Sequence, residues 1–123
     1  MSGLTILLVD DDREIRELIT EFLGMKGHEV IETGSGREAI EIVETGDNSI
    51  DVAVVDWQME GISGREVINA IKRELPDTKI LLATGCGAKD LPSSMLSKYS
   101  SGILRKPFSM KNLEREILEL SSV

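Results

Sequence analysis

Acidic, hydroxyl and ammonium side chains stand at four places in the sequence where an apolar segment ends. They are the Asp run at 10–12, Asp56, Thr84 and Lys106. Carboxylates that are crowded together repel one another and resist ionisation unless a cation joins them. Oxygen ligands favour a hard ion, and a small site with few carboxylates and some water suits Mg²⁺ better than Ca²⁺. These residue types therefore predict a magnesium site, provided that the fold brings them together.

A site of this composition suits the transfer of a phosphoryl group. If Asp10, Asp11 and Asp56 are all ionised, Mg²⁺ and Lys106 balance their three negative charges. A carboxylate oxygen can then attack phosphorus while the metal and the ammonium neutralise the transferring group.

Each of these residues also has a plain structural interpretation when it is taken alone. Asp12, and Asp11 as well, could cap the helix that follows and favour its positive end. Asp56 could form a turn, Thr84 could be an ordinary strand residue and Lys106 a solvated charge. Their joint occurrence at the ends of separate predicted strands favours the chemical interpretation.

Two hydrophobic periodicities alternate along the chain and predict the elements that position these residues. Short apolar runs rich in β-branched residues predict strands at 4–9, 29–33, 51–57, 79–84 and 102–105. Apolar residues at helical spacing predict helices over 15–23, 39–43, 67–75 and 113–120. The last of these helices is expected to begin near Ser109, which is a good N-cap. A short fourth helix is expected between Pro92 and Tyr99, where the apolar pattern is weak.

Strands that alternate with helices predict a parallel sheet with right-handed crossovers and helices on both faces. The nearly continuous apolar character of the strands supports this, because such strands are buried on both sides. In open sheets of this type, chemistry takes place beyond the carboxyl ends of the strands. The acidic run, Asp56, Thr84 and Lys106 are therefore expected at one edge.

Two local signals concern turns and helix starts. The tetrapeptide Ser-Gly-Arg-Glu occurs at 35–38 and again at 63–66, each time before a helical apolar stripe. Ser followed three residues later by Glu predicts a capping box, in which each side chain binds a backbone N–H at the other's position. His28 follows Gly27 in a turn, where we expect a surface side chain without partners.

Composition limits the kind of protein that this chain can be. A length of 123 residues suits one domain, and a net charge of −8 argues against direct nucleic-acid binding by this segment. No apolar run approaches the roughly 20 residues that cross a bilayer, so we expect no membrane insertion. One cysteine, Cys86, excludes an internal disulfide. We expect a soluble, acidic, cytoplasmic α/β domain.

Four segments resemble the receiver domains of response regulators in two-component signalling, chemotaxis regulators included. They are ILLVDDD at 6–12, VVDWQMEGISG at 54–64, ILLATG at 80–85 and LRKPF at 104–108, in the family's order and separation. The resemblance spans nearly the whole chain. It implies a single receiver domain over 1–123 and a flavodoxin-like, doubly wound sheet of five parallel strands in the order 2-1-3-4-5.

The resemblance also implies roles for individual residues. Asp56 corresponds to the phosphoacceptor. Asp11 and Asp56 correspond to direct Mg²⁺ ligands, with Asp10 acting through water and the backbone carbonyl of Gln58 completing the site. Thr84 and Lys106 correspond to the hydroxyl and the ammonium that contact the phosphoryl group. The Lys106–Pro107 peptide bond is expected to be cis.

The same resemblance implies a partner and a mode of action. The phosphoryl group is expected to come from a phosphohistidine on a sensor histidine kinase or a phosphotransfer protein. The kinase is expected to dock near Ile15 and the loop that holds Pro107 and Phe108. The domain is expected to be a switch that assists only its own phosphorylation and dephosphorylation, and not an enzyme acting on other substrates.

Three positions depart from the usual receiver pattern. Glu60 stands where Pro is usual, Ser63 stands where Asp is common, and Ile103 replaces the usual switch aromatic. The Ile103 replacement puts in doubt the familiar coupling of Thr84 to a rotating ring.

Two other functions compete with this interpretation. A phosphatase of the haloacid dehalogenase type also uses an aspartate nucleophile, and Asp10, Asp12, Thr84 and Lys106 can be fitted to that scheme. The chain is short for such an enzyme, however, and lacks an acidic pair after the lysine. A receiver that serves only as an unphosphorylated docking scaffold is the other alternative, against which the complete set of site residues argues.

Overall fold

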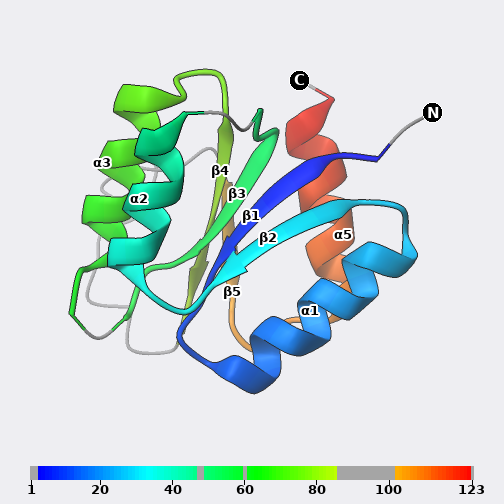
Figure 1. The fold of residues 1–123 in the computed structure, drawn as a ribbon. Helices are drawn as coiled ribbons and strands as arrows, with labels where there is room; N and C mark the ends of the chain where they lie inside the picture. The colour runs from blue at the N-terminus through cyan, green and yellow to red at the C-terminus, as the bar shows by residue number, and fades with distance from the viewer. Residues whose placement is uncertain (1–2, 47–48, 60, 86–101, 123) are drawn as a thin grey trace.

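A computed structural model describes residues 3–46, 49–59, 61–85 and 102–122. Five parallel strands form one sheet in the order β2-β1-β3-β4-β5 (Figure 1), so the predicted fold class and strand order are confirmed. The strands are β1 (Thr5–Val9), β2 (Glu29–Thr33), β3 (Val52–Asp56), β4 (Lys79–Thr84) and β5 (Gly102–Arg105).

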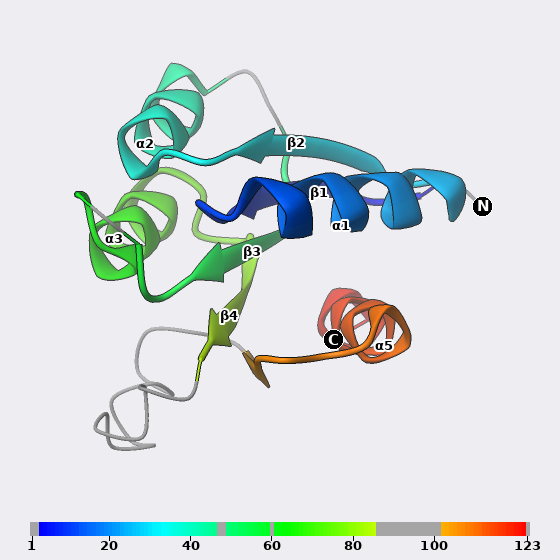
Figure 2. The same cartoon turned by 90° about the horizontal axis from the view of Figure 1, so that it is seen from below.

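Helices cover both faces of the sheet. The helices of the described segments are α1 (Arg13–Met25), α2 (Gly36–Thr45), α3 (Gly64–Glu74) and α5 (Met110–Ser121). Figure 2 shows α1 and α5 on one face of the sheet and α2 and α3 on the other. Across the described segments, no helix combines the length and the apolar character that a membrane span requires. The helix expected between Pro92 and Tyr99 lies outside the described residues, as do Glu60 and Cys86.

Two apolar clusters fill the space between the sheet and these helix pairs. Alternate residues of a strand point to opposite faces of the sheet. Leu7 and Val9 of β1 therefore belong to the cluster under α2 and α3, whereas Ile6 and Leu8 belong to the cluster under α1 and α5. All four side chains are buried. Burial on both faces is the physical reason for the uninterrupted apolar sequences of the central strands.

Short polar side chains begin all four described helices. Each accepts a hydrogen bond from a backbone N–H of the first turn, and the caps are Asp12, Ser35, Ser63 and Ser109. These contacts confirm the expected starts of the first and last helices. They also assign to Asp12 the structural role that was expected for it beside the acidic site.

The predicted capping box at 35–38 is half wrong. Ser35 Oγ accepts from Glu38 N–H at 3.2 Å, as expected. The backbone N–H of Ser35, however, donates to Thr33 Oγ1 at 3.1 Å, and the Thr33 hydroxyl in turn donates to the Glu38 carboxylate. A hydroxyl at the end of β2 thus relays the contact that Glu38 was expected to make directly, because the buried Thr33 lies between the two groups.

The glycines of the two repeated tetrapeptides permit close approaches of backbone. A Cβ on Gly64 would lie 2.7 Å from the carbonyl oxygen of Asp56 and 2.9 Å from Cα of Trp57. A Cβ on Gly36 would lie 2.9 Å from the carbonyl oxygen of Ile62. Both helix starts therefore pack directly against the segment that follows β3, and the sequence alone had not explained why glycine recurs.

His28 is not the partnerless surface residue that the sequence suggested. Its Nδ1 accepts a hydrogen bond from the backbone N–H of Leu4 at 3.0 Å, and the side chain is half-buried. The contact ties the turn after α1 to the start of β1, 24 residues earlier. Such a long-range partner leaves no trace in the local sequence.

Gly64→Ala is expected to lower the free energy of unfolding by about 1–3 kcal/mol, because the added methyl group meets backbone that cannot move aside. Gly24→Ala is the matched control, since nothing lies within 4 Å of a Cβ at that helical position. It should raise the free energy of unfolding by about 0.5–1 kcal/mol. Urea denaturation measures both values, and equal effects of the two substitutions would contradict the packing argument.

Candidate functional site

The carboxyl ends of four strands bring the predicted residues to one edge of the sheet. Asp10 follows β1, Asp56 and Thr84 end β3 and β4, and Lys106 follows β5. Asp10 is 3%, Asp56 5% and Thr84 0% exposed, which is exceptional for polar side chains and requires that they be paired or functional. In the backbone, Lys106 N–H donates to the Thr84 carbonyl at 2.7 Å, which continues the strand pairing up to the lysine.

Lys106 joins the two buried carboxylates. Its Nζ donates to Asp10 Oδ2 at 2.9 Å and to Asp56 Oδ2 at 3.2 Å. The Lys106–Pro107 peptide bond is cis, as expected. One ammonium thus joins the ends of two strands. Asp10 lies 96 residues and Asp56 50 residues before the lysine in the sequence.

The second oxygen of each buried carboxylate orders the turn beyond its strand. Asp10 Oδ1 accepts from Asp12 N–H at 2.9 Å, and Asp56 Oδ1 accepts from Gln58 N–H at 3.0 Å. The two strand ends therefore use the same local solution, a side chain that binds the backbone two residues later. Because the backbone is fixed, the carboxylates face one another across the edge of the sheet.

Asp10, Asp11 and Asp56 form a group of oxygen donors suited to a divalent cation. One carboxylate oxygen from each lies within 4.8 Å of the others. Asp11 is exposed whereas the other two are buried, so the group opens to solvent on the side of Asp11. Hard oxygen ligands with access for water fit Mg²⁺, which retains several of its waters when it binds to proteins.

Burial and charge change the acidity of the groups at this site. Burial raises the pKa of Asp56, and the negative charge of Asp10 adds to the shift, although Lys106 and the N–H of Gln58 oppose it. Burial lowers the pKa of Lys106, but its hydrogen bonds and attraction to Asp10 and Asp56 outweigh that effect, so that the pKa is raised overall. The surroundings therefore favour the charged form of Lys106 and disfavour that of Asp56.

Thr84 places a hydroxyl in the site that has no hydrogen-bond partner among the described residues. A buried hydroxyl without a partner costs free energy, so such a group calls for an explanation. Ile103, one strand away, is half-buried and packs against the cluster under α2 and α3. The hydroxyl is thus available to a ligand at the edge of the sheet.

The sequence interpretation missed the residues that hold the backbone of Asp10. The N–H of Asp10 donates to the Thr33 carbonyl at 3.1 Å, and Arg16 Nη1 donates to the Asp10 carbonyl at 2.9 Å. Neither contact has a local signal. Arg16 follows the acidic run at 10–12 by one helical turn, but an ordinary solvated arginine often has the same spacing.

An apolar groove of about 390 Å³ borders the site on the side of α1. It is lined by Ile15, Leu18, Gly85, Lys106, Pro107, Phe108 and Met110. Leu18 is 56% exposed, whereas Ile19 and Leu23 of the same helix are buried against the sheet. Because Lys106 lines both the groove and the acidic site, a molecule bound in the groove would reach the carboxylates.

A family model described as the response regulator receiver domain matches residues 6–118 of this chain. The phosphate regulon transcriptional regulatory protein PhoB of Pseudomonas aeruginosa is 34% identical over 115 residues, which are 92% of this chain and 49% of that protein. A cyclic di-GMP phosphodiesterase of Thermotoga maritima is 31% identical over 114 residues, which are 93% of this chain and 30% of that protein. The chain therefore spans half or less of the length of these curated relatives.

One solved structure is similar to this chain over almost the whole length of both proteins. It is that of the response regulator protein TrrA from Thermotoga maritima in complex with Mg²⁺–BeF. The two chains share 32% sequence identity with a TM-score of 0.81, and the match covers 98% of this chain and 99% of that one.

Asp56→Asn is expected to raise the unfolding temperature in metal-free buffer near pH 7, because it removes a buried charge whose pKa the fold raises. In the unfolded chain Asp56 has its ordinary pKa of 3.8, and in the folded protein its pKa is higher. The free energy of unfolding therefore falls as the pH rises from about 3.8 through the pKa of the folded state. The variant cannot ionise, and its advantage should shrink as the pH falls toward about 4. Thermal unfolding monitored by circular dichroism measures the difference.

Asp77→Asn is the control for this prediction, because Asp77 is an exposed carboxylate in the loop between α3 and β4. It should leave the unfolding temperature close to that of the wild type at each pH. A difference between wild type and Asp56→Asn that stays constant over this pH range would contradict the effect of burial.

Proposed function

The chain belongs to the response regulator receiver domain family, and we propose that Asp56 is the residue that accepts the phosphoryl group. Receiver domains are phosphorylation-activated switches that bind Mg²⁺ at an acidic pocket, and histidine kinases or phosphotransfer proteins phosphorylate them. One observation carries the assignment of Asp56: the carboxylate is buried at the end of β3, 3.2 Å from the Lys106 ammonium and beside two further carboxylates.

We propose that oxygens of Asp10, Asp11 and Asp56 and the backbone carbonyl of Gln58 form the metal site, with Asp10 acting through water. Their carboxylates offer the hard donors that the ion requires. When bound, Mg²⁺ supplies positive charge that neutralises the oxygens of the transferring group.

The chemical step requires only the groups at this edge of the sheet. A lone pair of an Asp56 carboxylate oxygen forms the new O–P bond while the N–P bond of the phosphohistidine breaks and its electrons return to the imidazole. Lys106, already 3.2 Å from Asp56, neutralises charge on the transferring group. Thr84 donates its hydroxyl to a phosphoryl oxygen, which gives this buried group the partner that it otherwise lacks among the described residues.

Phosphorylation changes the charge balance on which the pocket depends. The phosphoryl group adds roughly −1.5 to −2 charges near pH 7 and several strong acceptor oxygens. Lys106 already binds Asp56, and the Thr84 hydroxyl has no partner among the described residues, so we expect both to move toward the phosphoryl group. Ile103 has no hydroxyl or aromatic edge to offer, and it follows this movement by packing alone.

The phosphatase alternative is not favoured. Asp12, the second aspartate that this scheme needs, instead caps α1 by accepting a hydrogen bond from Ile15 N–H at 3.2 Å. The unphosphorylated docking scaffold is not favoured either, since the metal donors, the hydroxyl and the ammonium all converge.

Further properties of the whole protein are proposals. We propose that residues 1–123 form one receiver domain that acts as a switch and not as an enzyme on other substrates. Its phosphoryl donor is a sensor histidine kinase or a phosphotransfer protein, and we place this exchange in the cytoplasm. With a net charge of −8, the segment itself does not bind nucleic acid directly.

The donor is expected to dock in the apolar groove beside α1. The groove borders Lys106, and its exposed member Leu18 offers apolar surface that α1 does not use for its own packing. Ile15 contributes in two ways, because it lines the groove and also packs against the cluster under α1 and α5. A donor bound there would lie beside Lys106, whose ammonium is 3.2 Å from Asp56.

Incubation with acetyl phosphate and Mg²⁺ is expected to label Asp56, and mass spectrometry after hydroxylamine or borohydride treatment locates the acyl phosphate. Asp56→Asn should abolish the label, whereas Asp51→Asn, at an exposed position just before β3, should keep it. Lys106→Ala should slow labelling by about 10²-fold or more, as the loss of a transition-state donor does. Label on Asp10, or undiminished labelling of Asp56→Asn, would refute the assignment.

Leu18→Ala is expected to slow phosphotransfer from the cognate kinase by about tenfold, the effect of removing an apolar anchor worth about 1.4 kcal/mol. Labelling by acetyl phosphate should be unchanged, because that small donor does not need the groove. Ile15→Ala should act in the same direction and also lower stability. Met25→Ala, at the other end of α1 and 79% exposed, is the control. Equal slowing with both donors would contradict docking at this groove.

A further inference from the structure

We infer that Arg16 is a positioning residue for the metal site, acting through the backbone of Asp10 and not by contact with the metal. The inference rests on the proposed function, since it assumes that the carboxylates of Asp10, Asp11 and Asp56 hold Mg²⁺. It assigns a role to a residue of α1 whose charge would otherwise suggest only a surface ion pair.

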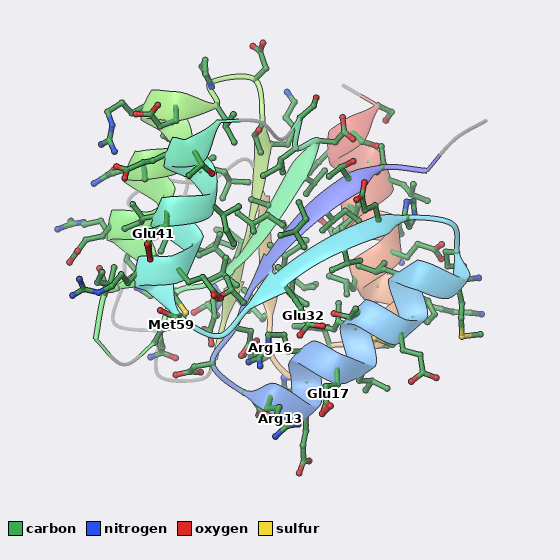
Figure 3. The ribbon with its side chains drawn as sticks, in the orientation of Figure 1. Arg13, Arg16, Glu17, Glu32, Glu41 and Met59 are labelled. Atoms are coloured by element: carbon green, nitrogen blue, oxygen red, sulfur yellow. The ribbon has the colours of Figure 1, made fainter. Side chains whose placement is uncertain are left out.

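The guanidinium of Arg16 joins the turn after β1, which holds Asp10 and Asp11, to β2. Its Nη1 donates to the carbonyl oxygen of Asp10 at 2.9 Å, and its Nε donates to Glu32 Oε1 at 3.0 Å. Figure 3 shows Arg16 and Glu32 together between α1 and β2. The Arg16 side chain is only 18% exposed. The planar fork of arginine suits two such acceptors, which a single ammonium could not bind in the same way.

The carbonyl that Arg16 binds belongs to the peptide unit between Asp10 and Asp11. Because a peptide unit is planar, fixing its oxygen also fixes the orientation of the bond that leads into Asp11. On the other side of Asp10, its N–H donates to the Thr33 carbonyl at 3.1 Å. The residue is therefore held to β2 through both of its peptide units, directly on one side and through Arg16 and Glu32 on the other.

Gly34 leaves the space that the guanidinium occupies. A Cβ at position 34 would lie 2.6 Å from Nη1 and 3.2 Å from Cζ of Arg16, while the nearest backbone atom would be the Asp10 oxygen at 3.5 Å. Gly34 does not have a positive φ, so an alanine there is acceptable to the backbone. A methyl group at this position would thus displace the guanidinium and little else.

Charge alone does not explain this arrangement. A lone cation beside the acidic group would repel Mg²⁺, but Glu32 at 3.0 Å cancels most of the field of Arg16 at longer range. The effect of Arg16 on the metal site is therefore its hydrogen bond to the Asp10 carbonyl and the peptide orientation that this bond imposes. By contrast, Arg13 and Glu17 on the same helix form an ion pair of 3.5 Å whose side chains are 81% and 58% exposed.

Two variants, one double and one single, remove the contact without changing net charge. Arg16→Gln combined with Glu32→Gln deletes both partners, whereas Gly34→Ala keeps both and pushes the guanidinium aside. Each is expected to raise the Mg²⁺ dissociation constant on the order of tenfold, as the loss of an outer partner of a metal ligand does. Titration with MgCl₂ followed by the fluorescence of Trp57, the only tryptophan and the neighbour of Asp56, measures it.

Arg13→Gln combined with Glu17→Gln is the matched control, and its dissociation constant should stay within about twofold of the wild type. Thermal unfolding in metal-free buffer shows that each variant is folded. A dissociation constant within about twofold of the wild type for either Gly34→Ala or the Arg16–Glu32 double variant would overturn the inference. Failure of the wild type itself to bind Mg²⁺ would instead refute the proposed function on which it rests.

Discussion

The burial of two like charges around one ammonium is the constraint on which this receiver domain depends. Asp10 and Asp56 are both nearly inaccessible, and Lys106 lies 2.9 and 3.2 Å from them. Without a cation the two carboxylates could not remain ionised side by side. Burial raises the pKa of Asp56, so a cation beside this carboxylate favours its charged form.

The parallel sheet satisfies this constraint because it directs all its strands to the same edge. Chain segments far apart in sequence end there, and two apolar clusters hold the sheet between helix pairs. The close approaches of Gly36 and Gly64 bring the starts of α2 and α3 onto the segment beyond β3. The scaffold thereby fixes the backbone around Asp56 before any ligand is present, which lowers the cost of ordering the site during chemistry.

Hydrogen bonds to the backbone hold the turns that carry the acidic side chains. Each buried carboxylate orders the turn after its own strand, and the turn after β1 is held further by Thr33 and Arg16. The exposed Asp11 follows directly on the peptide unit whose carbonyl Arg16 binds. Metal affinity in such a site reflects the rigidity of the turn as well as the number of oxygens.

Local periodicity and residue type were sufficient to predict the strands, the helix caps and the chemically active residues, because each of these depends on neighbouring positions in the chain. The strands at 29–33, 79–84 and 102–105 have the predicted bounds, and the resemblance supplied the strand order. The contacts between distant segments became visible only in the folded chain. They are the partner of His28, the hydrogen bonds of Thr33, the need for glycine at 36 and 64, and the hydrogen bond from Arg16 to Asp10. Such contacts join residues through the packing of whole elements, and no spacing within one element encodes them.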